Sequence, residues 1–328
     1  MIQTIRKGDL FKRPECIIDA QKSKSQKLIV EILIFIAVYM VVQMIASILA
    51  TIPIMIALFS SNEFVLASAQ GDVAAAMQVA MNLVASGENN IFVVTNLYIT
   101  VVSIAVSIIF CRCVEKRSFK SMGIFKKGFG AEYLVGLLIG FVMFALAVAI
   151  CVMTGTLEIK GWSSDLSFGW LVVFFIGFLI QGMSEELLCR SYFMVSLARR
   201  QNLLVAIILN SLVFALLHLG NSGLSLLALV NLMLFGIFAS VYFIKRGSVW
   251  GIGAIHSMWN FAQGNVFGIK VSGMGLSESL LTSNSTATGT LVNGGAFGLE
   301  GGIAVTIVLI VAIVLISLTK GKYTAEED

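Results

Sequence analysis

The sequence predicts an all-α protein, a polytopic bundle of about eight transmembrane helices. Hydrophobic residues make up 58% of the 328 residues, charged residues make up only 12%, and the mean hydropathy is +0.95. Soluble domains carry more charge than this. Apolar runs near or above the roughly 20 residues that cross a ~30 Å hydrocarbon core recur along the whole chain. Lipid is therefore the expected solvent, and no soluble domain has room to form.

Each expected span is an apolar run bounded by polar or charged residues. In chain order the spans are Leu28 to Leu58, Ile91 to Cys113, Tyr133 to Thr154, Trp170 to Ala198, Leu203 to Leu219, Leu224 to Ile244, Val249 to Phe267 and Ile303 to Leu318. Residues 64 to 86 predict an interfacial or partly inserted helix, and residues 272 to 302 predict a polar loop. No proline follows Pro53, so the later helices are expected to run unbroken. Gly136 and Gly140 are four residues apart, a spacing that lets another helix approach closely.

Lysine and arginine predict the orientation, because cytoplasmic segments retain positive charge. The basic clusters lie in residues 6–27, 116–127, 199–200, 245–246 and 320–322, which fall on one side if all eight spans cross. The opposite loops are mainly acidic. Both termini are therefore predicted to be cytoplasmic, with a basic segment at 1–27, a transmembrane domain at 28–319 and a tail at 320–328.

Charge and cysteine usage argue against two other classes of protein. The net charge is +4 and the pI is about 8.8, but the basic residues form short clusters between apolar runs, so nucleic acid is not an expected partner. The five cysteines are an odd number without metal-finger spacing, and Cys111 and Cys113 flank Arg112. Reduced thiols are expected.

The fourth span contains three formal charges, at Glu185, Glu186 and Arg190. Left unpaired at the helix centre, three such charges cost roughly 8 to 10 kcal/mol. Glu186 and Arg190 are four residues apart, with the acid first, so they can neutralise each other on one helix face. Glu185 lies about 100° around the helix from Glu186 and lacks that partner. Glu186 is thus assigned a structural role and Glu185 a catalytic role. Two hydrated acids at the membrane interface would give the same pattern.

The two histidines of the chain, His218 and His256, both lie in apolar spans. Asn260 shares a helix face with His256, and Phe214 shares one with His218, so Phe214 can form the wall of a common cavity. A carboxylate, two imidazoles and a carboxamide suit amide hydrolysis, with Glu185 as the general base on a water.

Two other uses of these side chains fit the sequence in part. The same set could hold a metal such as zinc through Glu185, His218 and His256, but the His-Glu-x-x-His pattern is absent. The cofactor therefore stays open between none and a divalent metal. Cys189 shares a face with Glu185, but a thiolate beside acids is disfavoured, so it is assigned to packing.

The three motifs Glu185-Glu186-x-x-x-Arg190, Phe214-x-x-x-His218 and His256-x-x-x-Asn260 lie in this order on adjacent spans. They resemble the motifs of the CAAX protease and bacteriocin-processing family, also called the CPBP or Abi family. The resemblance covers residues 170 to 267, within an expected family core of about 130 to 268.

The resemblance implies an intramembrane endopeptidase of a multi-pass, bacterial plasma-membrane type, acting on a peptide or a membrane-protein substrate. In that family the first glutamate and the second-motif histidine are thought to activate water. The third-motif histidine and asparagine are thought to stabilise the oxyanion. These roles fall on Glu185, His218, His256 and Asn260, with support from Glu186, Arg190 and Phe214.

Two further classes of protein use the same features. A proton-coupled transporter would use Glu185 and the histidines as a relay, but the sequence has no internal repeat and no helix-breaking proline in the later spans. A non-catalytic membrane immunity or scaffold protein would not require Glu185. Helix geometry adds one constraint, because His218 lies roughly 25 Å beyond the turn at Arg200, whereas His256 is only about 10 Å from Val249. Projection of the fourth and fifth helices beyond the bilayer is the expected solution.

Overall fold

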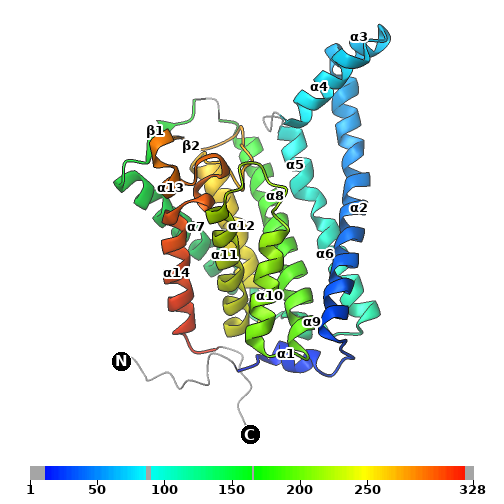
Figure 1. The fold of residues 1–328 in the computed structure, drawn as a ribbon, viewed down its shortest axis with the longest axis vertical. Helices are drawn as coiled ribbons and strands as arrows, with labels where there is room; N and C mark the ends of the chain where they lie inside the picture. Colours follow the sequence, from blue (N-terminus) through cyan, green and yellow to red (C-terminus); the bar gives the residue numbers. More distant parts are fainter. Residues whose placement is uncertain (1–11, 86–89, 165, 322–328) are drawn as a thin grey trace.

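The computed structural model describes residues 12–85, 90–164 and 166–321, and most of its long helices run in roughly the same direction (Figure 1). A helix forms at each of the eight predicted segments. These helices are α2 (Leu28–Ser60), α5 (Asn90–Ile99) continued by α6 (Val101–Ile109), α7 (Phe129–Met153), α8 (Phe168–Glu186), α10 (Leu203–Leu216), α11 (Leu226–Arg246), α12 (Trp250–Phe261) and α14 (Ile303–Ser317). The predicted fold class, a polytopic bundle of membrane helices, is confirmed.

Among the described residues, five helical stretches are long and apolar enough to cross a membrane by themselves. They are Leu28–Ser60, Asn90–Val114, Phe129–Met153, Phe168–Ala198 and Leu226–Arg246. α10, α12 and α14 are shorter, and α10, with 14 residues, is about 21 Å long against a core of ~30 Å. The number of spans therefore stays a prediction.

α12 lies between α7 and α8, and glycines set the two close approaches. A Cβ atom at Gly136 or Gly140 of α7 would clash with the carbonyl oxygens of Gly251 and Ile255. The small residues four apart in α7 thus serve helix packing, as their spacing predicts. On the other side, a Cβ at Gly182 of α8 would lie 2.5 Å from the Ser257 backbone nitrogen. The helix that carries His256 and Asn260 is therefore held on both sides.

The helices are not as regular as the lack of proline predicts. Residues Phe110–Val114, Leu187–Met194 and Ala262–Val266 are π-helical. Two of these segments continue α8 and α12 directly, next to the predicted site residues. Such wider turns are common at functional sites and need no proline, so the sequence pattern does not reveal them.

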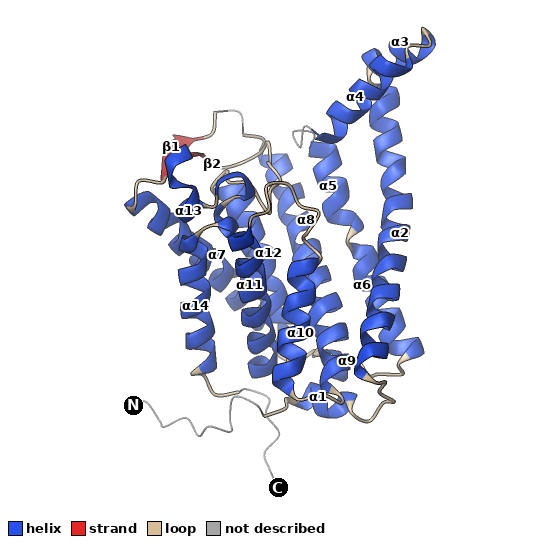
Figure 2. Cartoon of the chain, viewed as in Figure 1, coloured by secondary structure: helices blue, strands red, loops and turns tan. Residues whose placement is uncertain are grey.

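The predicted polar loop contains regular structure as well. Strand β2 (Leu281–Ser285) pairs antiparallel with β1 (Leu157–Trp162), as the red arrows of Figure 2 show. Short helical turns follow, among them α13 (Thr290–Asn293). Strands of this length carry too little periodic signal to be distinguished from a loop.

The two ends of the bundle differ in character. At one end, α3 (Asn62–Ala69) and α4 (Val73–Ala85) extend beyond the other helices at the tip of α2 (Figure 1). The sequence predicted one helix over 64–86; the structure has two, joined at Gly71 with φ +70°, and residue 86 lies outside the described part of the chain.

The opposite end carries α1 (Glu15–Ala20) and α9 (Val195–Ala198) (Figure 1). Arg199 pairs there with Glu31 at 3.0 Å and also with Glu115. The Arg13 guanidinium donates to the carbonyl of Gln201, 2.8 Å away. Described residues of the first and third basic clusters thus meet at one end of the bundle; that this end is cytoplasmic stays a prediction.

Candidate active site

Glu186 has two partners, of which the sequence predicted one. Its Oε1 lies 2.9 Å from Arg190 Nη1, and both side chains are fully buried. The same oxygen lies 2.8 Å from Nδ1 of His256, on the neighbouring helix α12. The Arg190 guanidinium also lies 4.5 Å above the centre of the Phe214 ring. Glu186 therefore neutralises Arg190 and at the same time fixes the orientation of the His256 ring.

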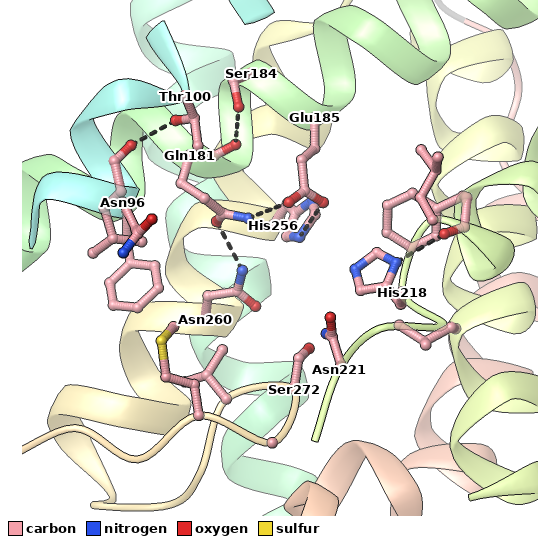
Figure 3. Close-up of a pocket in the computed structure, with 18 of the residues that line it drawn as sticks. Asn96, Thr100, Gln181, Ser184, Glu185, His218, Asn221, His256, Asn260 and Ser272 are labelled. Carbon is pink, nitrogen blue, oxygen red and sulfur yellow. Dashed lines mark hydrogen bonds and ion pairs between the residues drawn. The ribbon is translucent and has the colours of Figure 1, made fainter. Parts of the chain in front are cut away.

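Glu185 points in another direction, into a cavity, and its side chain is 29% exposed there. Gln181, one turn earlier on α8, donates from Nε2 to Glu185 Oε1 at 2.5 Å. Gln181 Oε1 in turn accepts from Asn260 Nδ2 at 2.9 Å. The other carboxylate oxygen, Oε2, lies 3.8 Å from His256 Nε2, too far for a hydrogen bond. Figure 3 shows this polar chain from Asn260 through Gln181 to Glu185.

Gln181 is a site residue that the sequence reasoning missed. The available signal was its position four residues before Glu185, where a carboxamide can bond the carboxylate. Its second bond, to Asn260, joins α8 to α12 and has no counterpart in local spacing.

His218 lies just beyond the end of α10 and faces the same cavity (Figure 3). Its Nδ1 lies 2.8 Å from the carbonyl oxygen of Phe214, which holds the ring and leaves Nε2 toward the cavity. The Phe214 ring centre lies 4.8 Å from that of His218 and 6.1 Å from that of His256. Phe214 thus packs against both histidine rings, as expected for a wall residue.

The cavity has a volume of about 980 Å³. Glu185, His218, His256 and Asn260 all line it, and so does Phe214. Cys189, assigned to packing, is 1% exposed and also contacts the cavity. This volume is at the upper end of small-ligand sites and is sufficient for a short peptide segment.

One buried carboxylate fastens a loop over part of the cavity. Glu300 Oε2 accepts from the backbone nitrogen and the hydroxyl of Ser272, at 2.9 and 2.8 Å. Glu300 Oε1 accepts from Trp259 Nε1 at 3.2 Å, directly beside Asn260 in the chain. Both Ser272 and Glu300 line the cavity. The sequence predicted only that Ser272 and Glu300 lie in a polar loop. Their contacts link residues far apart in the chain and leave no periodic signal in the sequence.

The donor arrangement does not fit a metal centre. Within residues 12–85, 90–164 and 166–321, no group of three or more His, Cys, Asp or Glu side chains is arranged to hold a metal ion. The conditional set of Glu185, His218 and His256 shares a cavity but not a coordination geometry. The five cysteines are free thiols.

The geometry defines a class of protein: a multi-pass membrane protein whose helices enclose a carboxylate, two imidazoles and carboxamides around one cavity. Residues 167–262 match the family model described as type II CAAX prenyl endopeptidase Rce1-like. This match supports the resemblance of this segment to the CAAX protease and bacteriocin-processing family, a family of intramembrane CAAX-type endopeptidases. The comparison with curated proteins gave no match, and neither did the comparison with solved structures.

Proposed function

We propose that this protein hydrolyses a peptide bond of a membrane-associated peptide or protein by means of a water molecule activated by Glu185. The state of the Glu185 carboxylate carries this proposal. One oxygen is oriented by Gln181, whereas Oε2 is buried and has no hydrogen-bond partner among the described residues. A buried carboxylate oxygen without a partner is costly unless a water or a substrate group occupies it.

The positions of the polar atoms support the following reaction. A water bound at Glu185 Oε2 gives its proton to the carboxylate as its oxygen attacks the carbonyl carbon of the substrate. When His218 donates from Nδ1 to the Phe214 carbonyl, Nε2 is an acceptor that orients the attacking water. Glu185 then returns the proton to the departing amine nitrogen, so the carboxylate is regenerated.

The negative charge on the carbonyl oxygen needs donors, and α12 supplies two. Asn260 uses one N–H on Gln181 and retains the second. When both ring nitrogens of His256 carry a proton, Nδ1 donates to Glu186 and Nε2 is a donor on the side of Glu185. Donors fixed before the reaction stabilise the transition state without a cost of reorganisation. No step requires a metal.

The experiment compares Glu185→Gln with wild type, both purified and reconstituted in lipid nanodiscs. The probe is a mixture of end-blocked ten-residue peptides with apolar centres, and cleavage is followed by mass spectrometry. Glu63→Gln, on the exposed first turn of α3, is the matched control. We expect a loss of cleavage of about 10²-fold or more in Glu185→Gln and none in the control. Equal cleavage by Glu185→Gln and wild type would remove Glu185 from the mechanism.

A further inference from the structure

The cavity extends well beyond the family-matched segment, to the face of α2. Six residues of α2 at helical spacing line it: Tyr39, Val42, Gln43, Ala46, Ser47 and Ala50. The lipid-facing side of the same helix is apolar and exposed, with Met40 at 65%, Met44 at 59% and Ile48 at 60%. The helix is therefore two-sided, with small and polar residues toward the cavity.

α5 and α6 present a second polar row to the same cavity, at Asn96, Thr100 and Ser103. Asn96 Nδ2 donates to the carbonyl of Phe92 at 2.9 Å, and the Thr100 hydroxyl donates to the carbonyl of Leu97 at 2.6 Å. These local bonds use donors and leave the Asn96 and Thr100 side-chain oxygens as acceptors. Figure 3 shows Asn96 and Thr100 in the cavity together with Gln181 and Glu185.

Gln43, Ser47, Asn96, Thr100 and Ser103 are here called the polar wall. Inside a membrane such groups are costly and usually serve transport, binding or catalysis. Hydroxyl and amide groups match the N–H and C=O groups of an extended main chain. The stretch from Tyr39 to Ala50 is about 16 Å long, which equals about five residues of extended chain. Apolar lining residues, including Phe92, Phe178 and Leu276, provide contacts for the intervening side chains.

We propose that the polar wall binds the main chain of an extended, mostly apolar peptide segment that flanks the bond cleaved at Glu185. This inference rests on the proposed function, because it assigns the substrate of that same site. The wall lies in α2, α5 and α6, outside residues 167–262 that match the family model. Substrate recognition is thus divided from the family-matched segment that supplies Glu185, His218, His256 and Asn260.

A pair of threonines provides a matched test. Thr100 lines the cavity, whereas Thr51 is an exposed residue of α2, and each hydroxyl donates to the carbonyl three residues earlier at 2.6 Å. Thr100→Val and Thr51→Val therefore make the same local change. With the best-cleaved peptide of the mixture, we expect Thr100→Val to raise KM about 3- to 10-fold with kcat nearly constant. Thr51→Val should match wild type; equal effects in the two variants would overturn the proposal.

A second measurement tests main-chain recognition directly. N-methylation of the same peptide, at residues two or more positions from the cleaved bond, removes main-chain donors and leaves the side chains. Wild type should lose affinity for the methylated peptide by a similar factor, and Thr100→Val should lose less, because its acceptor is already absent. If the losses of affinity caused by Thr100→Val and by N-methylation add fully at every methylated position, the peptide main chain does not contact the polar wall at Thr100.

Photo-crosslinking separates this inference from the proposed function. Benzoylphenylalanine replaces Ser47 in the wall, or Met44 on the lipid side, in Glu185→Gln protein with the peptide mixture as probe. Capture of peptide from position 47 and not from 44 supports the wall even if wild type cleaves nothing. Cleavage by wild type without capture at 47 leaves the proposed function standing and overturns the wall.

Discussion

Replacement of Glu186 by methionine tests whether this buried carboxylate has one role or two. Its Oε1 is shared between Arg190, at 2.9 Å, and His256, at 2.8 Å, and both members of the ion pair are fully buried. Glu186→Met leaves the Arg190 charge without its partner, which typically costs about 3–5 kcal/mol. The contact of Arg190 with the Phe214 ring is present before and after the change, so it does not reduce this difference.

The double variant Glu186→Met with Arg190→Met separates the two roles. Replacing both members of a buried ion pair by apolar residues is often neutral, so the cost of the unpaired charge should disappear. In the double variant, Nδ1 of His256 still lacks its acceptor, which lowers the free energy of unfolding by about 1–3 kcal/mol. Stability should therefore return most of the way to wild type. Peptide cleavage should not return, because His256 has lost the acceptor that orients its ring.

The assay measures both quantities on the same preparations. Denaturant unfolding in mixed micelles gives the free energy of unfolding, and cleavage of the peptide mixture gives kcat, which should stay about 10²-fold below wild type in both variants. Recovery of cleavage together with stability in the double variant would show that Glu186 only neutralises charge. A loss below about 1 kcal/mol in Glu186→Met would contradict the buried-charge argument itself.

Two further outcomes follow from packing and exposure. Gly140→Leu should lower the unfolding free energy by about 1–3 kcal/mol or more, since a Cβ atom at this position would clash with the Ile255 carbonyl. Gly130→Leu is the control: a Cβ atom there has open space around it, so this change should cost under about 1 kcal/mol. Thermal unfolding of the two variants measures the difference. Maleimide should label exposed Cys113 within minutes at pH 8 and leave Cys16 unlabelled, because Cys16 is buried and burial raises the pKa of its thiol to about 12. Labelling of Cys113 by an impermeant maleimide added outside sealed right-side-out vesicles would contradict the predicted orientation.

The parts of the fold that the sequence predicted are those with a local signal. Apolar runs predicted all eight helical segments, and the small residues Gly136 and Gly140 predicted a close helix approach. The π-helical segments, the β1–β2 pair and the division of 64–86 into two helices were missed. These three features depend on long-range contacts or on local backbone turns, which do not alter the periodic pattern of apolar residues in the sequence.

The site divides in the same way. The Glu186–Arg190 pair follows from spacing within one helix, and it is present. The bonds from Glu186 to His256 and from Gln181 to Asn260 cross from α8 to α12, so spacing alone does not reveal them. The structure brings both histidines to one cavity, with His218 in the turn that follows α10; projection of the fourth and fifth helices beyond the bilayer stays a prediction.

The glycine contacts around α12 have a consequence for how this protein can diversify. Gly136, Gly140 and Gly182 leave no room for even one added carbon against α12, so substitution there should disrupt the packing of α12. The cavity face of α2, by contrast, consists of small and polar side chains that line open space. Substitutions can accumulate on that face without displacing Glu185. The shape and polarity of the cavity can thus change on the α2 side while the packing that holds His256 and Asn260 stays the same.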